Sequence, residues 1–185
     1  FPNAGKSSLL NQLTNARTKV AGYPFTTKIP QLGMFRYVDH DIVLADIPGI
    51  IEGASKGAGM GFQFLRHLER TVGLAFLIDL SDDRYMDAYD TLCEELRSYA
   101  PELLEKPQVV IGTKTDEEFA PERLVELKNA RPELNVIGLS NFTGEGLDEV
   151  KQAFIQMVST SERRTEVDSD FTTTVDKDAE YRDEI

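Results

Sequence analysis

The sequence has little of several features that identify specialised classes of protein. It contains no tryptophan and one cysteine, Cys93, which excludes a disulfide framework within these residues. We expect Cys93 to be a small buried hydrophobic residue. No segment approaches the roughly 18 consecutive apolar residues of a membrane-spanning helix, so we expect no membrane span. Positive charge is also scarce, with 20 Lys and Arg against 32 Asp and Glu and a net charge of −12. Because contacts to nucleic-acid phosphates need Lys and Arg, this balance argues against nonspecific nucleic-acid binding by the whole surface.

The remaining composition indicates one domain followed by an acidic tail. With 185 residues, 41% of them hydrophobic, the chain is long enough for one stable core. Residues 162–185 carry nine acidic and four basic side chains and show no sustained helical period. We therefore predict a domain over residues 1–160 and an acidic flexible tail or linker over residues 161–185.

Short apolar runs alternate with amphipathic helical patterns along the domain. The expected strands cover residues 34–38, 41–46, 72–80, 107–114 and 134–140, and several of them are apolar on both faces. Helical stripes of apolar residues recur near residues 60–68, 85–99 and 147–158, and Pro121 suits the first turn of another helix. This alternation predicts an α/β fold of three layers, α/β/α, in which helices cover both faces of a mostly parallel sheet.

The chain begins with FPNAGKSS, which matches most of a phosphate-binding loop and is called the phosphate loop below. Gly5 permits close approach of the backbone to phosphate, Lys6 supplies a charge for the β and γ phosphates, and the Ser7 hydroxyl is an expected Mg²⁺ ligand. The first glycine of such a loop would stand immediately before Phe1, with a strand before it, so we expect that residues of this domain precede Phe1. The amides of the predicted cradle are those of Asn3, Ala4, Gly5, Lys6, Ser7 and Ser8.

Asp46 ends the apolar strand in VLADIPGI, and the glycine-dense segment EGASKGAGMG follows. A carboxylate at the end of this strand is placed to share Mg²⁺ with the phosphate loop. Glycine-rich backbone changes conformation at low cost. Together these segments predict a switch that responds to the bound nucleotide.

Two later loops, here called the base loops, carry residues suited to reading guanine. The first, Thr113–Asp116, follows an apolar strand, and the Asp116 carboxylate can accept both guanine donors, N1–H and the N2 amine, whereas adenine offers neither. The methylene stem of Lys114 can lie across the base plane. The second base loop begins at Ser140, and the amides of Ser140 and Asn141 are expected to bind guanine O6.

In this order and spacing, FPNAGKSS, DIPG, TKTD and LSN resemble the nucleotide-binding elements of the translation-factor-related GTPases. Two stretches, AGYPFTTKIPQLGMF and DIPGIIEGASKGAGMGFQFLRHLERT, resemble the switch regions of the Obg (CgtA) family. The resemblance implies a P-loop NTPase G domain in a cytoplasmic bacterial protein that binds guanine nucleotide, hydrolyses GTP slowly to GDP and acts in large ribosomal subunit assembly and stress control. We expect a monomer.

The resemblance also implies roles for the switch residues. Lys6, Thr27 and Gly49 would act in catalysis, with Thr27 joining Ser7 and Asp46 on Mg²⁺ in the triphosphate state. Members of the family carry a glycine-rich domain before this one. The strand before the phosphate loop would lie between the strands that end at Asp46 and Asp79, so a chain that truly began at Phe1 would have a gap in mid-sheet. Further contacts to nucleotide are implied for Phe25, Thr26, Ile47 and Pro48.

Several positions depart from the pattern that the resemblance implies. Thr113 stands where the family usually has Asn, so the tie between the base loop and the phosphate loop is expected to weaken. Asn141 replaces the usual Ala, and Ile50 stands where Ras-like enzymes have the Gln that orients the attacking water. Asn3 matches the Asn that potassium-dependent GTPases use to hold K⁺. Bracing of the loop and K⁺ binding both remain open for Asn3.

Two other functions fit part of the sequence. The YchF branch of Obg-like hydrolases prefers adenine and shares the glycine-rich switch, but it normally lacks an Asp at the position of Asp116. A nucleotide-dependent ribosome-binding module with negligible turnover is the other alternative. A scaffold alone would not require Lys6, Ser7, Thr27 and Asp46 together.

Overall fold

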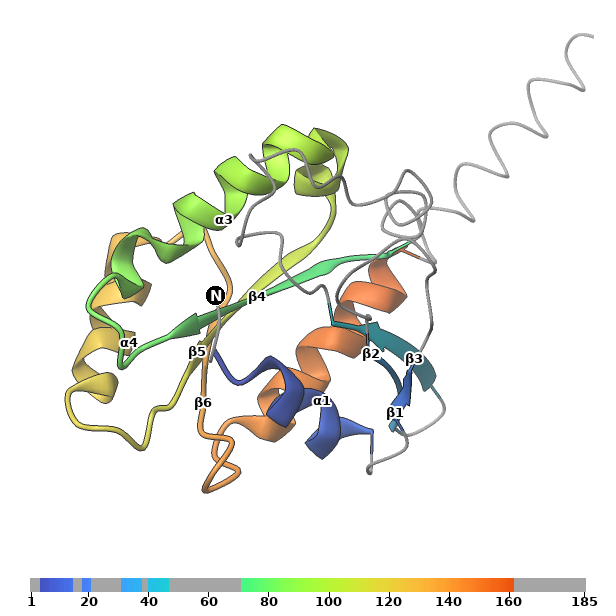
Figure 1. Cartoon of the computed structure of the whole chain (residues 1–185), viewed down its shortest axis with the longest axis horizontal. Helices are drawn as coiled ribbons and strands as arrows, with labels where there is room; N and C mark the ends of the chain where they lie inside the picture. Colours follow the sequence, from blue (N-terminus) through green and yellow to red (C-terminus); the bar gives the residue numbers. More distant parts are fainter. Residues whose placement is uncertain (1–3, 15–17, 21–30, 38–39, 47–70, 162–185) are drawn as a thin grey trace, which may run out of the picture.

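The structure is a computed structural model, which describes residues 4–14, 18–20, 31–37, 40–46 and 71–161 (Figure 1). The expected helix at residues 60–68 lies outside these residues, and so does the expected tail except for its first residue, Ser161, which is the last residue of a helix. Within them the chain forms two three-stranded sheets and the helices packed against them. None of the helices in the described ranges is long and apolar enough to cross a membrane.

The first sheet is antiparallel, in the order β1-β2-β3. It consists of β1 (Thr18–Val20), β2 (Gln31–Tyr37) and β3 (His40–Ala45). Phe35 and Ile42 are cross-strand partners that point into the core, with exposed fractions of 2% and 8%. Their neighbours Met34 and Val43 form the next cross-strand pair and are exposed. Alternation of this kind is expected for a sheet with one face on the core.

The second sheet is parallel, in the order β4-β5-β6. It consists of β4 (Leu74–Asp79), β5 (Gln108–Thr113) and β6 (Val136–Leu139). β5 lies between the other two, and each of its residues after Gln108 is buried. An apolar run without alternation is the pattern of such a central strand.

Helices cover both faces of the parallel sheet. The connections contain α3 (Tyr85–Tyr99), the short 3-10 helix η2 (Pro101–Glu105) and α4 (Ala120–Ala130), while α1 (Lys6–Leu13) precedes the strands and a last helix spans residues 147–161. α3 and α4 pack on the face that carries Phe76 and Val110, whereas α1 and the last helix pack on the face that carries Val109 and Ile111. Figure 1 shows these two groups of helices on opposite sides of the sheet. The three-layer arrangement is therefore confirmed.

The predicted elements agree closely with the observed ones. All five expected strands are present, although the second ends at Ala45, so Asp46 lies one residue beyond it. β1 was not expected from the sequence. Cys93 is buried in α3, as predicted, and Pro121 lies in the first turn of α4. The parallel part of the expected sheet is confirmed in β4–β6, whereas β1–β3 form a separate antiparallel sheet among the described residues.

Candidate functional site

The loop after β6 meets the start of α1, and the loop after β5 contacts the loop after β6. Parallel strands end at one edge of a sheet, and in Figure 1 α1 begins close to that edge. A side-chain hydrogen bond joins the two regions, from Asn141 Nδ2 to the carbonyl oxygen of Gly5. The structure therefore brings together the base loops and the phosphate loop, which lie more than 100 residues apart in the sequence.

Gly5 sets the geometry of the phosphate loop. It is the N-cap of α1 and has φ 80° and ψ 15°, a left-handed conformation that favours glycine. No side chain caps the helix start by a hydrogen bond, and the first turn contains no acidic residue. Because unpaired amides and the helix dipole favour anions at a helix N-terminus, this arrangement suits phosphate. Lys6 lies in the first turn, half-buried, and Ser7 and Ser8 are exposed.

Asp46 lies directly after β3, and the positive charge of Lys6 acts on its carboxyl group. Burial raises the pKa of the Asp46 carboxyl, and the positive charge of Lys6 opposes that shift. One oxygen, Oδ1, is buried without a hydrogen-bond partner among the described residues. A buried carboxylate oxygen in this state is costly unless a cation completes it, so the donor set fits Mg²⁺.

The first base loop is held by contacts to β4. Thr113 is fully buried at the end of β5, and its hydroxyl donates to the carbonyl oxygen of Ile78 at 3.1 Å. The next residue, Lys114, has φ 63°, which is left-handed and uncommon outside glycine. Strain of this kind is common at ligand-binding sites.

Lys114 is fixed by Asp79, which ends β4. Its Nζ lies 2.5 Å from Asp79 Oδ2 and donates to Ser81 Oγ at 3.2 Å. The Ser81 backbone amide and hydroxyl both donate to Asp79 Oδ1, at 2.9 Å and 2.6 Å. Burial raises the pKa of Asp79, but the hydrogen bonds from Lys114 and Ser81 outweigh it and hold that pKa below its usual value. The carboxylate is therefore ionised at neutral pH and orients the Lys114 ammonium.

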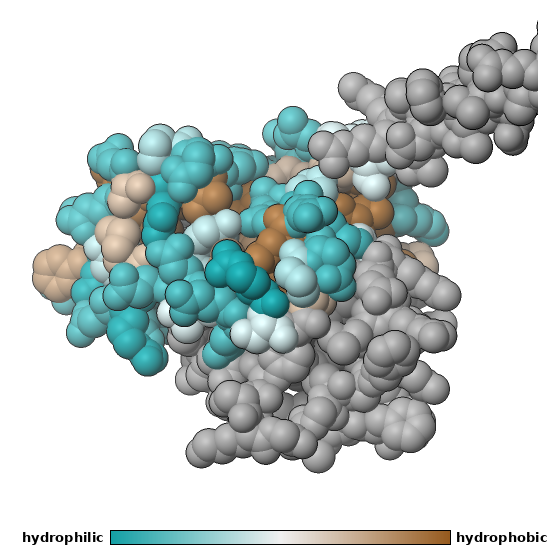
Figure 2. All heavy atoms as spheres, turned by 90° about the horizontal axis from the view of Figure 1, so that it is seen from above, coloured by the Kyte–Doolittle hydropathy of each residue, from teal (hydrophilic) through white to brown (hydrophobic). Residues whose placement is uncertain are grey.

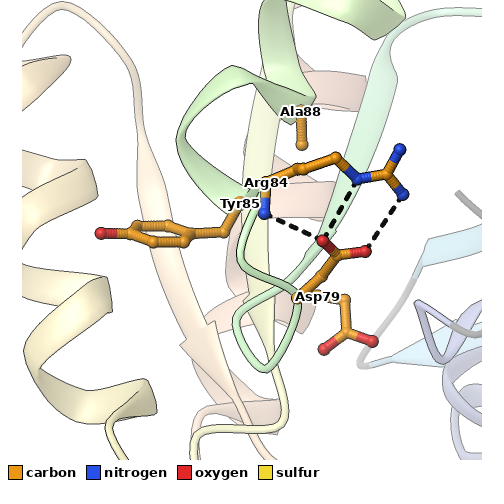
Figure 3. Close-up of a pocket in the computed structure, with 5 residues that line it drawn as sticks. Asp79, Arg84, Tyr85 and Ala88 are labelled. Atoms are coloured by element: carbon orange, nitrogen blue, oxygen red, sulfur yellow. Dashed lines mark hydrogen bonds and ion pairs between the residues drawn. The ribbon is translucent and has the colours of Figure 1, made fainter.

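Arg84, which lines the same hollow as Asp79, pairs with Asp82. The hollow is lined by Asp79, Asp82, Arg84, Tyr85 and Ala88. The dashed lines in Figure 3 mark the hydrogen bonds and ion pair between Arg84 and Asp82, and the carboxylate of Asp79 points away from Arg84. Asp79 is thus directed to Lys114.

Ser140 orients the carboxylate that was predicted to read guanine. Its hydroxyl donates to Asp116 Oδ1 at 2.5 Å and accepts hydrogen bonds from the amides of Phe142 and Thr143. Ser140 is fully buried, whereas Asp116 is exposed. A fixed and accessible carboxylate is the arrangement that recognition of a base with two donors requires. Phe142, beside it, is 89% exposed.

Asn141 contributes more than the backbone amide that was predicted. Its Nδ2 donates to Gly5 O at 3.3 Å, and its own carbonyl oxygen accepts a hydrogen bond from Gln12 Nε2 on α1. Thr113 does not make this link, because its hydroxyl is bonded to β4.

The predicted site is therefore assembled in part. The structure brings together Gly5 with Asn141 and Asp116 with Ser140, and it places Lys114 against Asp79. Sequence reasoning missed Asp79 and Ser81, although DLSD has the same pattern of an apolar strand ending in a carboxylate that identified Asp46. The predicted residues Asn3, Phe25, Thr26, Thr27, Ile47, Pro48 and Gly49 lie outside the described residues.

Comparisons with known proteins agree with this geometry. The family described as 50S ribosome-binding GTPase matches residues 1–114. A GTPase Obg of Treponema denticola is 58% identical over 158 residues, which cover 85% of this chain and 41% of that protein. The chain thus spans less than half the length of the curated relatives it matches first.

Solved structures give the same result for the fold. The G domain of the T. maritima FeoB iron transporter is 27% identical, with a TM-score of 0.63, over 85% of this chain and 93% of that one. A nucleolar GTP-binding protein 1 of Plasmodium falciparum has a TM-score of 0.68 at 19% identity, over 95% and 91% of the two chains, which supports the fold alone. The fold is that of a P-loop GTPase G domain. On these similarities the chain belongs to the 50S ribosome-binding GTPase family, and the predicted resemblance to the Obg GTPases is confirmed.

Proposed function

We propose that this chain is the nucleotide-binding domain of a GTPase switch that binds GTP with Mg²⁺ and hydrolyses it slowly to GDP and phosphate. The observation that carries the proposal is the exposed Asp116 carboxylate, held by Ser140 in the same loop whose next residue, Asn141, contacts the phosphate loop. The proposal is supported by the family match over residues 1–114 and by the Obg relatives.

Guanine is the base that this arrangement favours. The two donors of guanine satisfy the Asp116 carboxylate, whereas adenine would leave it desolvated without a partner, at a cost of about 1–3 kcal/mol or more. We therefore expect Asp116→Asn to lose GTP affinity and to gain affinity for xanthosine triphosphate, whose C2 carbonyl can accept the new amide donor.

Competition of GTP, ATP and xanthosine triphosphate against a fluorescent GDP derivative tests this proposal. Asp148→Asn is the matched control, because Asp148 pairs with Lys151 on the last helix and lies outside the base loops. ATP binding as tight as GTP binding would favour the adenine-preferring, YchF-type alternative. An Asp116→Asn variant with unchanged GTP affinity would remove Asp116 from base recognition.

Phosphate and metal are held by the first turn of α1 and by Asp46. Lys6 would contact the β and γ phosphates, and Ser7 and Asp46 would hold Mg²⁺, with Thr27 joining in the triphosphate state. When bound, the metal neutralises charge on the phosphates. The Gly49 amide would meet the γ-phosphate. Loss of this phosphate on hydrolysis would remove both the Thr27 and the Gly49 contacts, so residues 22–32 and 49–61 should loosen together.

Hydrolysis is expected to be slow. Ile50 has no polar atom with which to orient water, so unassisted turnover should be near that of Ras alone, about 10⁻⁴ s⁻¹. Asn3 would hold K⁺ beside the phosphates, and the measurement is single-turnover hydrolysis in KCl and NaCl for the parent, Asn3→Ser and Ile50→Gln. Equal rates in both salts would exclude K⁺, and an undetectable rate in every condition would favour the ribosome-binding module without turnover.

The large ribosomal subunit is the partner we propose for the intact protein, in the cytoplasm and as a monomer. The family description supports this partner. Sedimentation of the intact protein with 50S subunits, in GDP and in a non-hydrolysable GTP analogue, tests it. Equal association in both nucleotide states would mean that the switch does not control this interaction.

A further inference from the structure

Two consecutive residues make different contacts at the junction between the phosphate loop and the second base loop. Ser140 holds Asp116, the residue proposed to read the base. Asn141, the next residue, holds Gly5 at the start of α1. Adjacent residues therefore hold the base subsite and the phosphate subsite.

The two regions are also in close steric contact. A Cβ atom on Gly5 would lie 2.5 Å from Asn141 Nδ2, so any other side chain at position 5 would displace the amide. Gly5 O also accepts the amide hydrogen bond of Leu9, in the first turn of α1. A shift of Asn141 is therefore transmitted to the backbone that starts this helix.

A second hydrogen bond supports the same link. Gln12, on the exposed side of α1, donates from Nε2 to the backbone carbonyl oxygen of Asn141. The side chain of Asn141 thus bonds the N-cap of α1, and its backbone carbonyl bonds a residue in the second turn. Two contacts of this kind fix the position of the second base loop along the helix.

The Asn141 amide is not fully satisfied. Its Oδ1 is buried and has no hydrogen-bond partner among the described residues. An unsatisfied buried acceptor lowers stability, so a purely structural role for Asn141 leaves this atom unexplained. A residue that completes its contacts as the two loops close around a ligand accounts for it.

We propose that Asn141 is a positioning residue that couples the base subsite to the phosphate subsite, so that occupation of either one favours binding at the other. The coupling passes from Asp116 through Ser140 and Asn141 to Gly5. By linkage, the effect is equal in both directions. This inference rests on the proposed function, because it assumes that nucleotide binds across both loops.

The coupling can be measured with the two halves of the ligand supplied separately. Guanosine probes the base subsite, and magnesium pyrophosphate probes the phosphate loop. The affinity of the intact protein for guanosine is measured by calorimetry with and without saturating pyrophosphate. For the parent we expect pyrophosphate to raise guanosine affinity about 3- to 10-fold, the range that one ordinary hydrogen bond contributes.

Asn141→Ala keeps the backbone amide that is expected to meet guanine O6 and removes the side-chain contact to Gly5, so it should bring this factor close to 1. Asn135→Ala is the matched control, because Asn135 is exposed just before β6, at the opposite end of the strand, and should retain the full factor. Gln12→Ala, which removes only the second contact, should retain part of it. If Asn141 had a merely structural role, Asn141→Ala would lower thermal stability and would weaken the binding of guanosine and of pyrophosphate equally.

Each result decides the inference. An unchanged factor in Asn141→Ala, or no cooperativity in a parent that binds both halves, would overturn the coupling and leave the proposed function intact. A parent that binds neither guanosine nor GDP would overturn the proposed function itself. If Asn141→Ala does not fold, Gln12→Ala decides, and an unchanged factor in that variant would refute the coupling.

Discussion

Replacement of Asp79 by Asn tests whether the ion pair with Lys114 prepares the site for nucleotide. The side chains of Lys114 and Asp79 are 35% and 11% exposed, which is intermediate between a surface pair and a buried one. A charged hydrogen bond contributes about 1.5–3 kcal/mol and an exposed ion pair about 0.2–1 kcal/mol. We therefore expect Asp79→Asn to lower the free energy of unfolding by about 1–2 kcal/mol.

Nucleotide affinity should fall in the same variant. Without the pair, the nucleotide itself must order Lys114, and fixing a lysine side chain costs up to about 2 kcal/mol of conformational entropy. If about half of this appears in binding, GDP affinity falls about 5-fold. Titration of a fluorescent GDP derivative, together with urea unfolding, separates the two effects.

Asp148→Asn is the matched control for the ion pair. It removes a lysine–aspartate pair of 2.7 Å on the last helix, where the Asp148 side chain is 77% exposed. It should change stability by less than about 0.5 kcal/mol and leave GDP affinity unchanged. An Asp79→Asn variant that behaves like this control would refute the reasoning.

The pH dependence of stability gives an independent measure of Asp79. Its pKa is lower in the folded protein than the ordinary value of 3.8. Its contribution is therefore present in full above that ordinary value and is lost as the pH falls through the lower folded pKa. Unfolding of the parent and of Asp79→Asn should differ most at neutral pH and converge below pH 3.8.

Three further predictions concern single residues of the site. Burial raises the folded pKa of Asp46, so without metal the free energy of unfolding should fall as the pH rises from the ordinary value of 3.8 through the raised folded pKa. Asp46→Asn should remove this fall and also the stabilisation by Mg²⁺, which is about 2.7 kcal/mol for a ligand at 100 times its Kd. Thermal unfolding in EDTA and in Mg²⁺ measures both effects. Gly5→Ala should lower the free energy of unfolding by about 1–3 kcal/mol, because alanine is strained at a φ of 80° and its Cβ would contact Asn141. An unfolding curve like that of the parent would contradict the left-handed conformation described for Gly5. Ser140→Ala should reduce the preference for GTP over ATP about 3- to 10-fold by freeing Asp116, and unchanged competition would show that Asp116 is oriented by other groups.

The fold was largely predictable because hydrophobic periodicity determines it. β5 is apolar on both faces, as a central parallel strand must be, and α3 carries one apolar stripe. β1 was missed because three residues, one of them Lys19, are too short to show a period of two. The break between β3 and β4 falls where the resemblance implied a gap, between the strands that end at Asp46 and Asp79.

The candidate site was predictable where a residue's own chemistry identifies it. Lys6, Asp46 and Asp116 stand out because each lies in a loop motif whose charge and spacing suit phosphate, Mg²⁺ or guanine. The pair between Asp79 and Lys114 was missed, because it depends on the left-handed backbone at Lys114, which turns the side chain toward β4. The role of the Asn141 side chain was missed because it depends on how closely α1 approaches the second base loop.

The exposed aromatic ring of Phe142 offers a way to follow this protein in real time. The sequence contains no tryptophan, and Phe142 is 89% exposed two residues after Ser140. Phe142→Trp would therefore introduce a single indole fluorophore at the base loop without removing a buried contact. Stopped-flow recording of its emission would report arrival and departure of unmodified nucleotides, free of the perturbation that a fluorescent ligand brings.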